Sequence, residues 1–181
     1  MRKITIAIIF LGLFTILFFV LKKGFSTKSG HQANLEVAKI KTSKMPLFEF
    51  VNLDSKPFSK YDLTKNKATI IVYFDPDCGL CEKSGKVFST FKSIHKNANV
   101  LFVSHNTKEK ILEYQDRFNL NAISNIRFLQ CNEDEFYNLF KEFNTPTYFI
   151  YNRKQELVKI INDDVPVETV LRYIKVAQIE L

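Results

Sequence analysis

The 181-residue chain has only three cysteines, and most of it carries no excess of charge of either sign. Three cysteines are too few, and odd in number, for the disulfide framework of a small secreted domain. Residues 1–45 contain eight basic residues and one acidic residue, whereas residues 46–181 contain eighteen of each, so the formal charge of +7 belongs to the N-terminal part. A neutral body lacks the basic surface that binds nucleic acid, and no nucleic-acid partner is expected.

Several signatures of catalysis are also missing from the sequence. It has no glycine-rich phosphate loop, no serine–histidine–aspartate arrangement, no cluster of carboxylates for a metal and no internal repeat. Hydrophobic residues, by contrast, make up 46% of the chain and include 18 phenylalanines, which predicts a folded core rather than disorder. The remaining candidates for chemistry are the cysteines.

A long uncharged segment lies near the N-terminus. Residues 4–21 contain no charged side chain, and as a helix they would extend about 27 Å, close to the ~30 Å hydrocarbon thickness of a bilayer. Basic residues flank the segment and no small-x-small cleavage site follows it, which favours an uncleaved membrane anchor over a cleaved signal peptide. We expect the N-terminus inside the cytoplasm and the folded domain outside it, on the periplasmic side of a bacterial inner membrane. The predicted organisation is an anchor at residues 1–23, a basic tether at residues 24–45 and a folded domain at residues 46–181.

Strand-like and helix-like patterns alternate through the predicted domain. Residues 68–74 form a predicted buried strand, because residues 70–74 are an uninterrupted apolar run. The next helix, predicted at residues 82–96, carries an apolar stripe that includes Phe91. Further strands are predicted at residues 47–51, 57–59, 100–103, 126–129, 147–151 and 157–161, and further helices after Thr107, Asn132 and Pro166. This order predicts an α/β fold with a closing antiparallel hairpin.

The motif Cys78-Gly79-Leu80-Cys81 lies between the strand at residues 68–74 and the helix that follows. Two cysteines that bracket two residues at a helix start can close a small disulfide ring, and the helix N-terminus favours the thiolate of the first. The alternatives are a structural disulfide or half of a zinc site. The other candidate zinc ligands are scattered without paired spacing: His31, His95, His105 and Cys131. The pattern therefore favours a redox dithiol.

The sequence pattern predicts a structural role for the remaining cysteine and surface positions for two of the histidines. Cys131 ends a predicted strand and is expected to be a half-buried structural residue, with a third redox thiol as the alternative. His95 and His105 flank a predicted strand and are expected at the surface.

The order of strand, Cys-x-x-Cys, helix, and then Thr145-Pro146-Thr147 before a hairpin and a last helix resembles the thioredoxin fold over residues 46–181. Residues 54–63, with the sequence DSKPFSKYDL, are similar to a segment of the TlpA/ResA-type membrane-anchored thiol-disulfide oxidoreductases. The resemblance implies a thioredoxin-like three-layer α/β fold with a central mixed sheet and an N-terminal hairpin extension, preceded by one transmembrane helix.

The resemblance also implies a role for each residue of the site. Cys78 would be the attacking thiolate and Cys81 would resolve the mixed disulfide, with Gly79 and Leu80 between them. Pro146 matches the cis-proline that faces the dithiol, and the backbone of Thr145 would pair with the substrate chain. Substrates would be protein thiols and disulfides, electrons would pass to or from a membrane-embedded redox partner, and no cofactor would be needed.

Several positions depart from the usual pattern of this family. Asp77 stands where a tryptophan is common, and Gly79-Leu80 lacks the frequent proline. Val72 occupies the position of the buried acid of thioredoxin, and Asp75 and Asp77 add negative charge that disfavours a nearby thiolate. The direction of electron flow therefore stays open between reductant, oxidant and isomerase. The alternative functions are a binding module with a structural disulfide, and a metal-delivery protein or peroxidase on the same fold.

Overall fold

The structure, a computed structural model, describes residues 43–142, 144–162 and 165–179. The predicted anchor and nearly all of the predicted tether lie outside these residues. None of the helices within them is long and apolar enough to cross a membrane. The predicted membrane span at residues 4–21 therefore stays a prediction.

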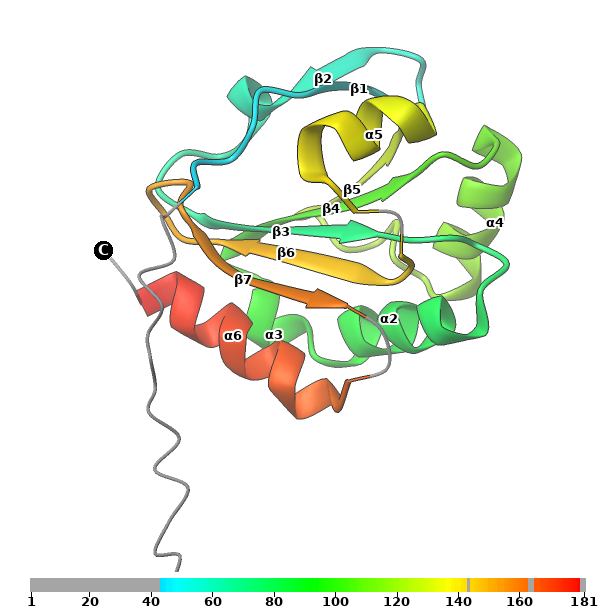
Figure 1. Ribbon diagram of the computed structural model, residues 1–181. Coiled ribbons are helices and arrows are strands. Elements are labelled where there is room, and N and C mark those ends of the chain that lie inside the picture. Colours follow the sequence, from blue (N-terminus) through cyan, green and yellow to red (C-terminus); the bar gives the residue numbers. More distant parts are fainter. Residues whose placement is uncertain (1–42, 143, 163–164, 180–181) are drawn as a thin grey trace, which may run out of the picture. The chain divides into compact units, whose positions relative to one another are not determined.

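Seven strands form one mixed sheet in the order β2-β1-β5-β4-β3-β6-β7 (Figure 1). The strands are β1 (Glu49–Asn52), β2 (Pro57–Ser59), β3 (Ala68–Tyr73), β4 (Ala98–Ser104), β5 (Ile126–Gln130), β6 (Thr147–Tyr151) and β7 (Leu157–Asn162). Strands β3, β4 and β5 are parallel, whereas β6 and β7 on one side and β1 and β2 on the other are antiparallel. The hairpin of β1 and β2 is the predicted N-terminal extension.

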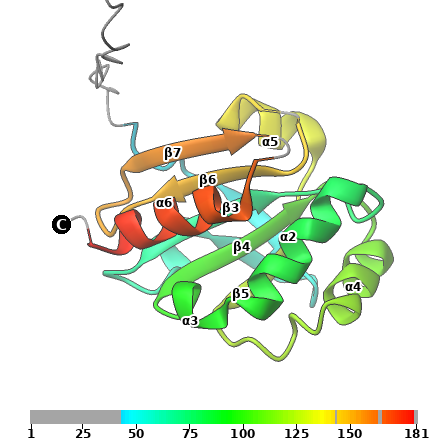
Figure 2. The same cartoon turned by 90° about the horizontal axis from the view of Figure 1, so that it is seen from below.

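Helices cover both faces of this sheet. They are α2 (Gly79–Thr90), α3 (Lys92–His95), α4 (Lys108–Arg117), α5 (Glu133–Phe140) and α6 (Val167–Ile179), with a short 3-10 turn η1 at Lys60–Asp62. Figures 1 and 2 show α5 on one face and α2, α3 and α6 on the other. Helix α4 joins the second group, because its buried side chains belong to the same core as those of α2 and α6. The predicted α/β fold with a central mixed sheet is confirmed.

The alternation of side chains along the central strand produces two cores. In β3, Ile70 and Val72 face α2, α4 and α6, whereas Ile71 and Tyr73 face α5. All six residues of β3 are buried, which explains its continuous apolar pattern. Both cores are rich in aromatic rings, which accounts for the many phenylalanines.

The predicted helix at residues 82–96 is divided in two. Phe91, with φ −97° and ψ 41°, leaves the helical conformation between α2 and α3. The side chain of Phe91 is 39% exposed, so its predicted place in the core stripe is wrong. Helix α2 instead begins earlier than predicted, directly after Cys78, and its close packing against α4 depends on Gly85. A Cβ atom there would overlap the ring of Phe118.

The prediction that His95 lies at the surface is wrong, because this side chain is only 1% exposed. Its Nε2 donates to the carbonyl oxygen of Phe88 at 2.8 Å, and its Nδ1 accepts from Nδ2 of Asn125 at 3.3 Å. The neutral ring therefore joins the end of α2 to the start of β5. Burial lowers the pKa of His95, since a charged ring would lose its hydration there.

The lowered pKa of His95 predicts that the stability of the folded chain depends on pH. A depressed pKa means that the unfolded chain binds the proton more tightly than the folded one. The stability that neutral His95 contributes is complete above a pH of about 6.5, the pKa of the ring in the unfolded chain. It is lost as the pH falls below that value. Urea unfolding between pH 7.5 and 5.5 should show a falling free energy of unfolding in the native chain and a flatter profile in His95→Gln. His105→Gln serves as the control, and equal slopes in all three chains would contradict the prediction.

Two described residues that precede residue 46 contact the turn between β6 and β7. Lys44 forms an isolated antiparallel bridge with Glu156, and their side chains form an ion pair at 2.9 Å. Met45 is 2% exposed, and its backbone N–H donates to the carbonyl oxygen of Gln155 at 2.8 Å. These two residues, assigned to the tether from the sequence, thus pack on the domain.

Candidate dithiol active site

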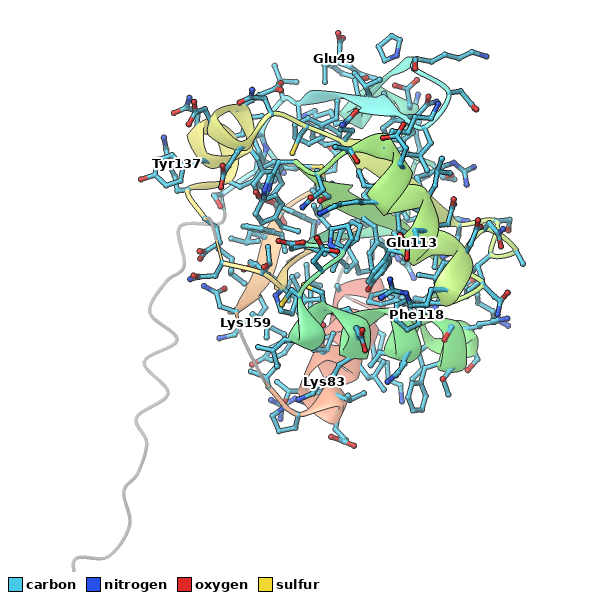
Figure 3. All side chains as sticks on the ribbon, turned by 90° about the vertical axis from the view of Figure 1, so that its right-hand side faces the viewer. Glu49, Lys83, Glu113, Phe118, Tyr137 and Lys159 are labelled. Atoms are coloured by element: carbon cyan, nitrogen blue, oxygen red, sulfur yellow. The ribbon has the colours of Figure 1, made fainter. Side chains whose placement is uncertain are left out.

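The two motif cysteines lie at the carboxyl edge of the parallel strands. Cys78 is the N-cap residue of α2, and Cys81 follows in the first turn. Figure 3 views this side of the molecule, with Lys83 of α2 below Glu113 of α4. Both cysteines are free thiols in this structure; Cys78 is half-buried, whereas Cys81 is fully buried. Cys78 is therefore the thiol that an incoming protein can reach.

The loop before β6 contacts both sulfur atoms. Its Thr145–Pro146 peptide bond is cis. The thiol of Cys78 donates to the carbonyl oxygen of Thr145, with 3.7 Å between Sγ and O. The side chain of Thr145 also acts on the thiol of Cys81 and lowers its pKa, against the larger effect of burial. The antiparallel pairing of β6 with β3 brings this loop beside the cysteines, which precede it by more than sixty residues.

The environment of Cys81 keeps its thiol protonated. Burial raises the pKa of Cys81 to about 12, because a buried thiolate would lose its hydration. Two weaker influences lower the pKa: the backbone N–H of Asp75, which donates to Sγ at 3.4 Å, and the side chain of Thr145. Cys81 is therefore a thiol at neutral pH, and it must lose its proton before it can attack a disulfide.

The acidic residues beside the motif are engaged with groups from the β4–α4 segment. The carboxylate of Asp77 forms an ion pair with Nζ of Lys110 on α4. Oδ1 of Asp75 accepts from the backbone N–H of Asp77 at 2.9 Å and from Nδ2 of Asn106 at 3.2 Å. The sequence pattern placed these two negative charges near the thiolate. It did not identify Lys110, whose positive charge offsets the negative charge of Asp77.

Hydroxyl groups surround the first turns of α2. The hydroxyl of Tyr114 donates to the carbonyl oxygen of Cys81 at 2.6 Å, and the hydroxyls of Ser84 and Tyr148 are 2.6 Å apart. Burial, followed by the proximity of Cys81, raises the pKa of Tyr114, which is therefore a neutral donor. Val72, at the position of the thioredoxin acid, is fully buried in the apolar core. Sequence reasoning missed these tyrosines, because their partners come from other elements.

A small, mainly apolar groove lies beside the dithiol. Its walls include Leu80 from the motif, Pro146 and Tyr148 from the β6 region, and Val165 and Val167 at the start of α6. Gly79 faces open space, since a Cβ atom there would have no neighbour within 4 Å. The motif is therefore open at Gly79, next to the apolar surface that Leu80 and Pro146 form.

The third cysteine and its neighbours lie near the same edge of the sheet. Cys131 is half-buried against the core under α5, and burial raises its pKa to about 12. Such an environment favours a structural role. His105, expected at the surface, is half-buried, and its Nδ1 lies 2.9 Å from the hydroxyl of Tyr73. Within the described ranges, no three histidine, cysteine or acidic side chains are grouped to hold a metal ion.

The contact between Thr145 and Cys81 predicts a measurable effect on the resolving step. In Thr145→Val, loss of the hydroxyl removes an interaction that lowers the pKa of Cys81, so its thiolate forms less readily. We expect decay of the mixed disulfide to slow by about two- to tenfold at neutral pH, as the loss of one weak hydrogen bond implies. Stopped-flow measurement with a chromogenic aromatic disulfide tests this. Thr145→Ser, which keeps the hydroxyl, should restore the native rate, and equal slowing in both variants would argue against the assignment.

Comparison with known proteins supports the fold from structure alone. No protein-family model matches the chain, and no curated protein matches its sequence. A secreted Mycobacterium tuberculosis disulfide oxidoreductase homologous to E. coli DsbE is similar in structure, with a TM-score of 0.61 and 13% identity over 71% of this chain and 95% of that one. A thioredoxin-family thiol:disulfide interchange protein from Chlorobium tepidum gives a TM-score of 0.60 at 19% identity, covering 76% and 97%.

Another similar structure is that of a protein whose described function differs. BsSco, a member of the Sco family of cytochrome c oxidase assembly proteins, gives a TM-score of 0.60 at 14% identity and covers 76% of this chain and 95% of that one. These proteins share the arrangement of the central sheet and its helices with the chain, at identities that establish the fold. The chain has the thioredoxin fold, as its sequence resemblance implied.

Proposed function

We propose that the chain is a membrane-tethered thiol-disulfide oxidoreductase that exchanges disulfides with proteins of the bacterial cell envelope. The observation that carries this proposal is the arrangement of Cys78 and Cys81 at the start of α2, with the thiol of Cys78 donating to the carbonyl oxygen of Thr145. A structural disulfide would not need one thiol that stays accessible at the surface while its partner is fully buried. The structural similarity to disulfide oxidoreductases supports the same reading.

The chemistry uses only these two sulfur atoms. The thiolate of Cys78 attacks one sulfur of a substrate disulfide, a mixed disulfide forms, and the other substrate sulfur leaves as a thiolate that takes up a proton. Cys81 then loses its proton and attacks Sγ of Cys78, which releases the second substrate sulfur. The substrate has gained two electrons, and the chain holds a Cys78–Cys81 disulfide. The reverse sequence oxidises a substrate dithiol, and no cofactor enters either direction.

The proposed location rests on the N-terminal sequence. The uncharged residues 4–21 would anchor the chain, with the dithiol domain on the periplasmic side of the inner membrane. A dithiol that is used repeatedly needs a partner that restores its redox state, and a membrane-embedded thiol protein is the partner that this location suggests. An activity reporter fused to the C-terminus distinguishes the two topologies: periplasmic activity supports the proposal and cytoplasmic activity rejects it.

Trapping of the mixed disulfide tests the proposed function. In the full-length Cys81→Ala chain, the intermediate on Cys78 cannot be resolved, so partner proteins should accumulate as reductant-sensitive adducts in native membranes. The native chain should also reduce insulin in the presence of dithiothreitol. Cys131→Ser, in which the motif is intact, should trap nothing and keep full activity. If Cys81→Ala yields no adduct while its Cys78 thiol still titrates, the oxidoreductase function is rejected.

A further inference from the structure

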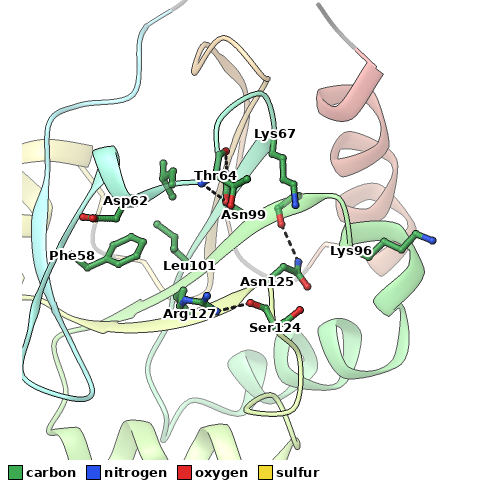
Figure 4. Close-up of a pocket in the computed structure, with 12 residues that line it drawn as sticks. Phe58, Asp62, Thr64, Lys67, Lys96, Asn99, Leu101, Ser124, Asn125 and Arg127 are labelled. Atoms are coloured by element: carbon green, nitrogen blue, oxygen red, sulfur yellow. Dashed lines mark hydrogen bonds between the residues drawn. The ribbon is translucent and has the colours of Figure 1, made fainter.

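A second hollow lies at the edge of the sheet opposite the dithiol. It is a polar cavity of about 170 Å³ between the turn before β3, the loop before β4 and the start of β5 (Figure 4). Phe58 and Leu101 form part of one wall. An engineered protein cavity of about 150 Å³ holds a benzene molecule. The hollow is therefore large enough for a phosphate group with a short carbon chain.

Positive charge dominates the lining of this cavity. Lys67, Lys96 and Arg127 contribute three cations, and Asp62 contributes one carboxylate. That carboxylate already accepts hydrogen bonds from the backbone N–H and the hydroxyl of Ser59, at 2.8 and 2.9 Å. None of the three cations forms an ion pair with another residue in the described part of the chain. The cavity thus has an uncompensated positive charge.

The cations differ in how they are held. Arg127 is fixed at the rim, because its NH1 donates to the carbonyl oxygens of Ser124 and Ile126 at 2.6 and 3.0 Å. Its other N–H groups have no acceptor among the described residues. Figure 4 shows the side chain of Lys67 reaching toward Asn125, whereas that of Lys96 points away from the other labelled residues. Lys67 and Arg127 are therefore the two cations placed to contact a bound anion.

Hydrogen bonds hold the walls in place without a ligand. The side chain of Asn99 bonds both the backbone N–H and the carbonyl oxygen of Thr64, each at 3.0 Å. The side chain of Asn125 donates to the carbonyl oxygens of His95 and Ala98 at 2.8 and 3.0 Å. Since these bonds fix the turn before β3 and the start of β5 to β4, the cavity is preformed, and binding need not order its walls.

We propose that this cavity binds a phosphate group. A phosphate presents several acceptor oxygens and up to two negative charges, which suits a lysine, an arginine and the hydroxyls of Thr64 and Ser124 around one small space. The wall of Phe58 and Leu101 would receive the carbon part of an ester. Two sources supply this chemistry: a phospholipid headgroup, which rests on the proposed anchor, and a soluble phosphate ester.

The charges along this edge bear on the lipid source. Further exposed cations, Lys65, Arg153 and Lys154, follow in the turns before β3 and after β6. Acidic residues gather instead around the dithiol edge, in Asp75 and the first turn of α5. An anionic lipid surface would therefore attract the cavity edge and repel the dithiol edge.

Titration of the full-length chain in a nonionic detergent tests the site, with inorganic phosphate and sn-glycerol 3-phosphate as probes. We expect saturable heat of binding, with amide chemical-shift changes at Thr64, Asn99 and Asn125. The double variant Lys67→Gln/Arg127→Gln should bind about tenfold more weakly or worse, as loss of charge-assisted hydrogen bonds predicts. The matched control Lys65→Gln/Arg153→Gln removes the same charge from the same edge outside the cavity and should change affinity less than about twofold.

Two outcomes overturn the proposal: no saturable binding by the native chain, or equal weakening in the two double variants, which would indicate general charge attraction. The mapping on the native chain does not depend on how the variants fold. The source is decided in nanodiscs of phosphatidylcholine, alone or mixed with phosphatidylglycerol. If lipid headgroups fill the cavity, phosphatidylglycerol weakens binding of sn-glycerol 3-phosphate. If the ligand is soluble, its affinity is the same in both membranes.

Discussion

Cys78→Ala is expected to lose thiol–disulfide exchange activity by about a thousandfold or more, because the only half-exposed thiol of the motif is the attacking group. Cys81 cannot replace it. Its sulfur is fully buried, and its pKa of about 12 leaves almost no thiolate at neutral pH. The measurement is insulin reduction by the full-length chain with dithiothreitol, together with the rate of reaction with a chromogenic disulfide.

The controls for this variant are built into the chain. Cys131→Ser should retain the native rate, because Cys131 packs under α5 rather than in the motif. Alkylation with iodoacetamide under native conditions should label Cys78 first and leave Cys81 unlabelled. An active Cys78→Ala chain, or preferential labelling of Cys81, would show that Cys78 is not the attacking sulfur. The result also separates the oxidoreductase from a binding module, whose partner affinity should survive the change.

The largest effect on stability is expected for Phe102→Ala, at about 3–5 kcal/mol. Phe102 lies in the middle of β4 and is fully buried. Its ring centroid is 5.0–6.1 Å from four aromatic neighbours, which come from the end of β3, α2, α4 and β5: Phe74, Phe88, Tyr114 and Phe128. Truncation leaves a cavity that these rigid rings cannot fill, and each loses a packing partner.

Phe91→Ala is the matched control, since it removes the same atoms from a side chain that is 39% exposed. Its cost should be below about 1 kcal/mol. Urea unfolding followed by circular dichroism gives both values. Because α2 and α4 rest on Phe102, its truncation should also expose Cys81 to alkylation below the unfolding midpoint. Similar losses of stability in the two variants would contradict the packing described for this core.

Local patterns predicted most of the secondary structure. The strand at residues 147–151 was predicted with the bounds that β6 has, and β3 differs from its prediction only at Phe74. Thr107 and Asn132 are the N-caps of α4 and α5, because their side chains accept from backbone N–H groups of the first turn. Such signals lie within a few residues of the element that they specify, which is why they can be read from one sequence.

The errors and omissions concern contacts between distant residues. His95 was assigned to the surface because nothing near it in the sequence reveals the carbonyl of Phe88 and the amide of Asn125 that bury it. The predicted apolar stripe has the correct helical spacing. Phe91 falls outside it because the prediction assumes one unbroken helix, whereas α2 ends before this residue. The pairing of Lys110 with Asp77 joins helix α4 to the loop before α2 at the carboxyl edge of the sheet, and spacing alone could not select it.

The position of Thr145 has a consequence for the synthesis of the protein. This residue follows Cys78 by 67 positions, so a ribosome completes the cysteine motif and the whole of α2 well before the loop that contacts them. A nascent chain that stops short of β6 contains the two cysteines without the hydroxyl, the carbonyl or the proline beside them. Its thiols would behave as those of an ordinary peptide. The dithiol therefore becomes a specific reagent only when β6, which begins about four fifths of the way along the chain, has been made and has paired with β3.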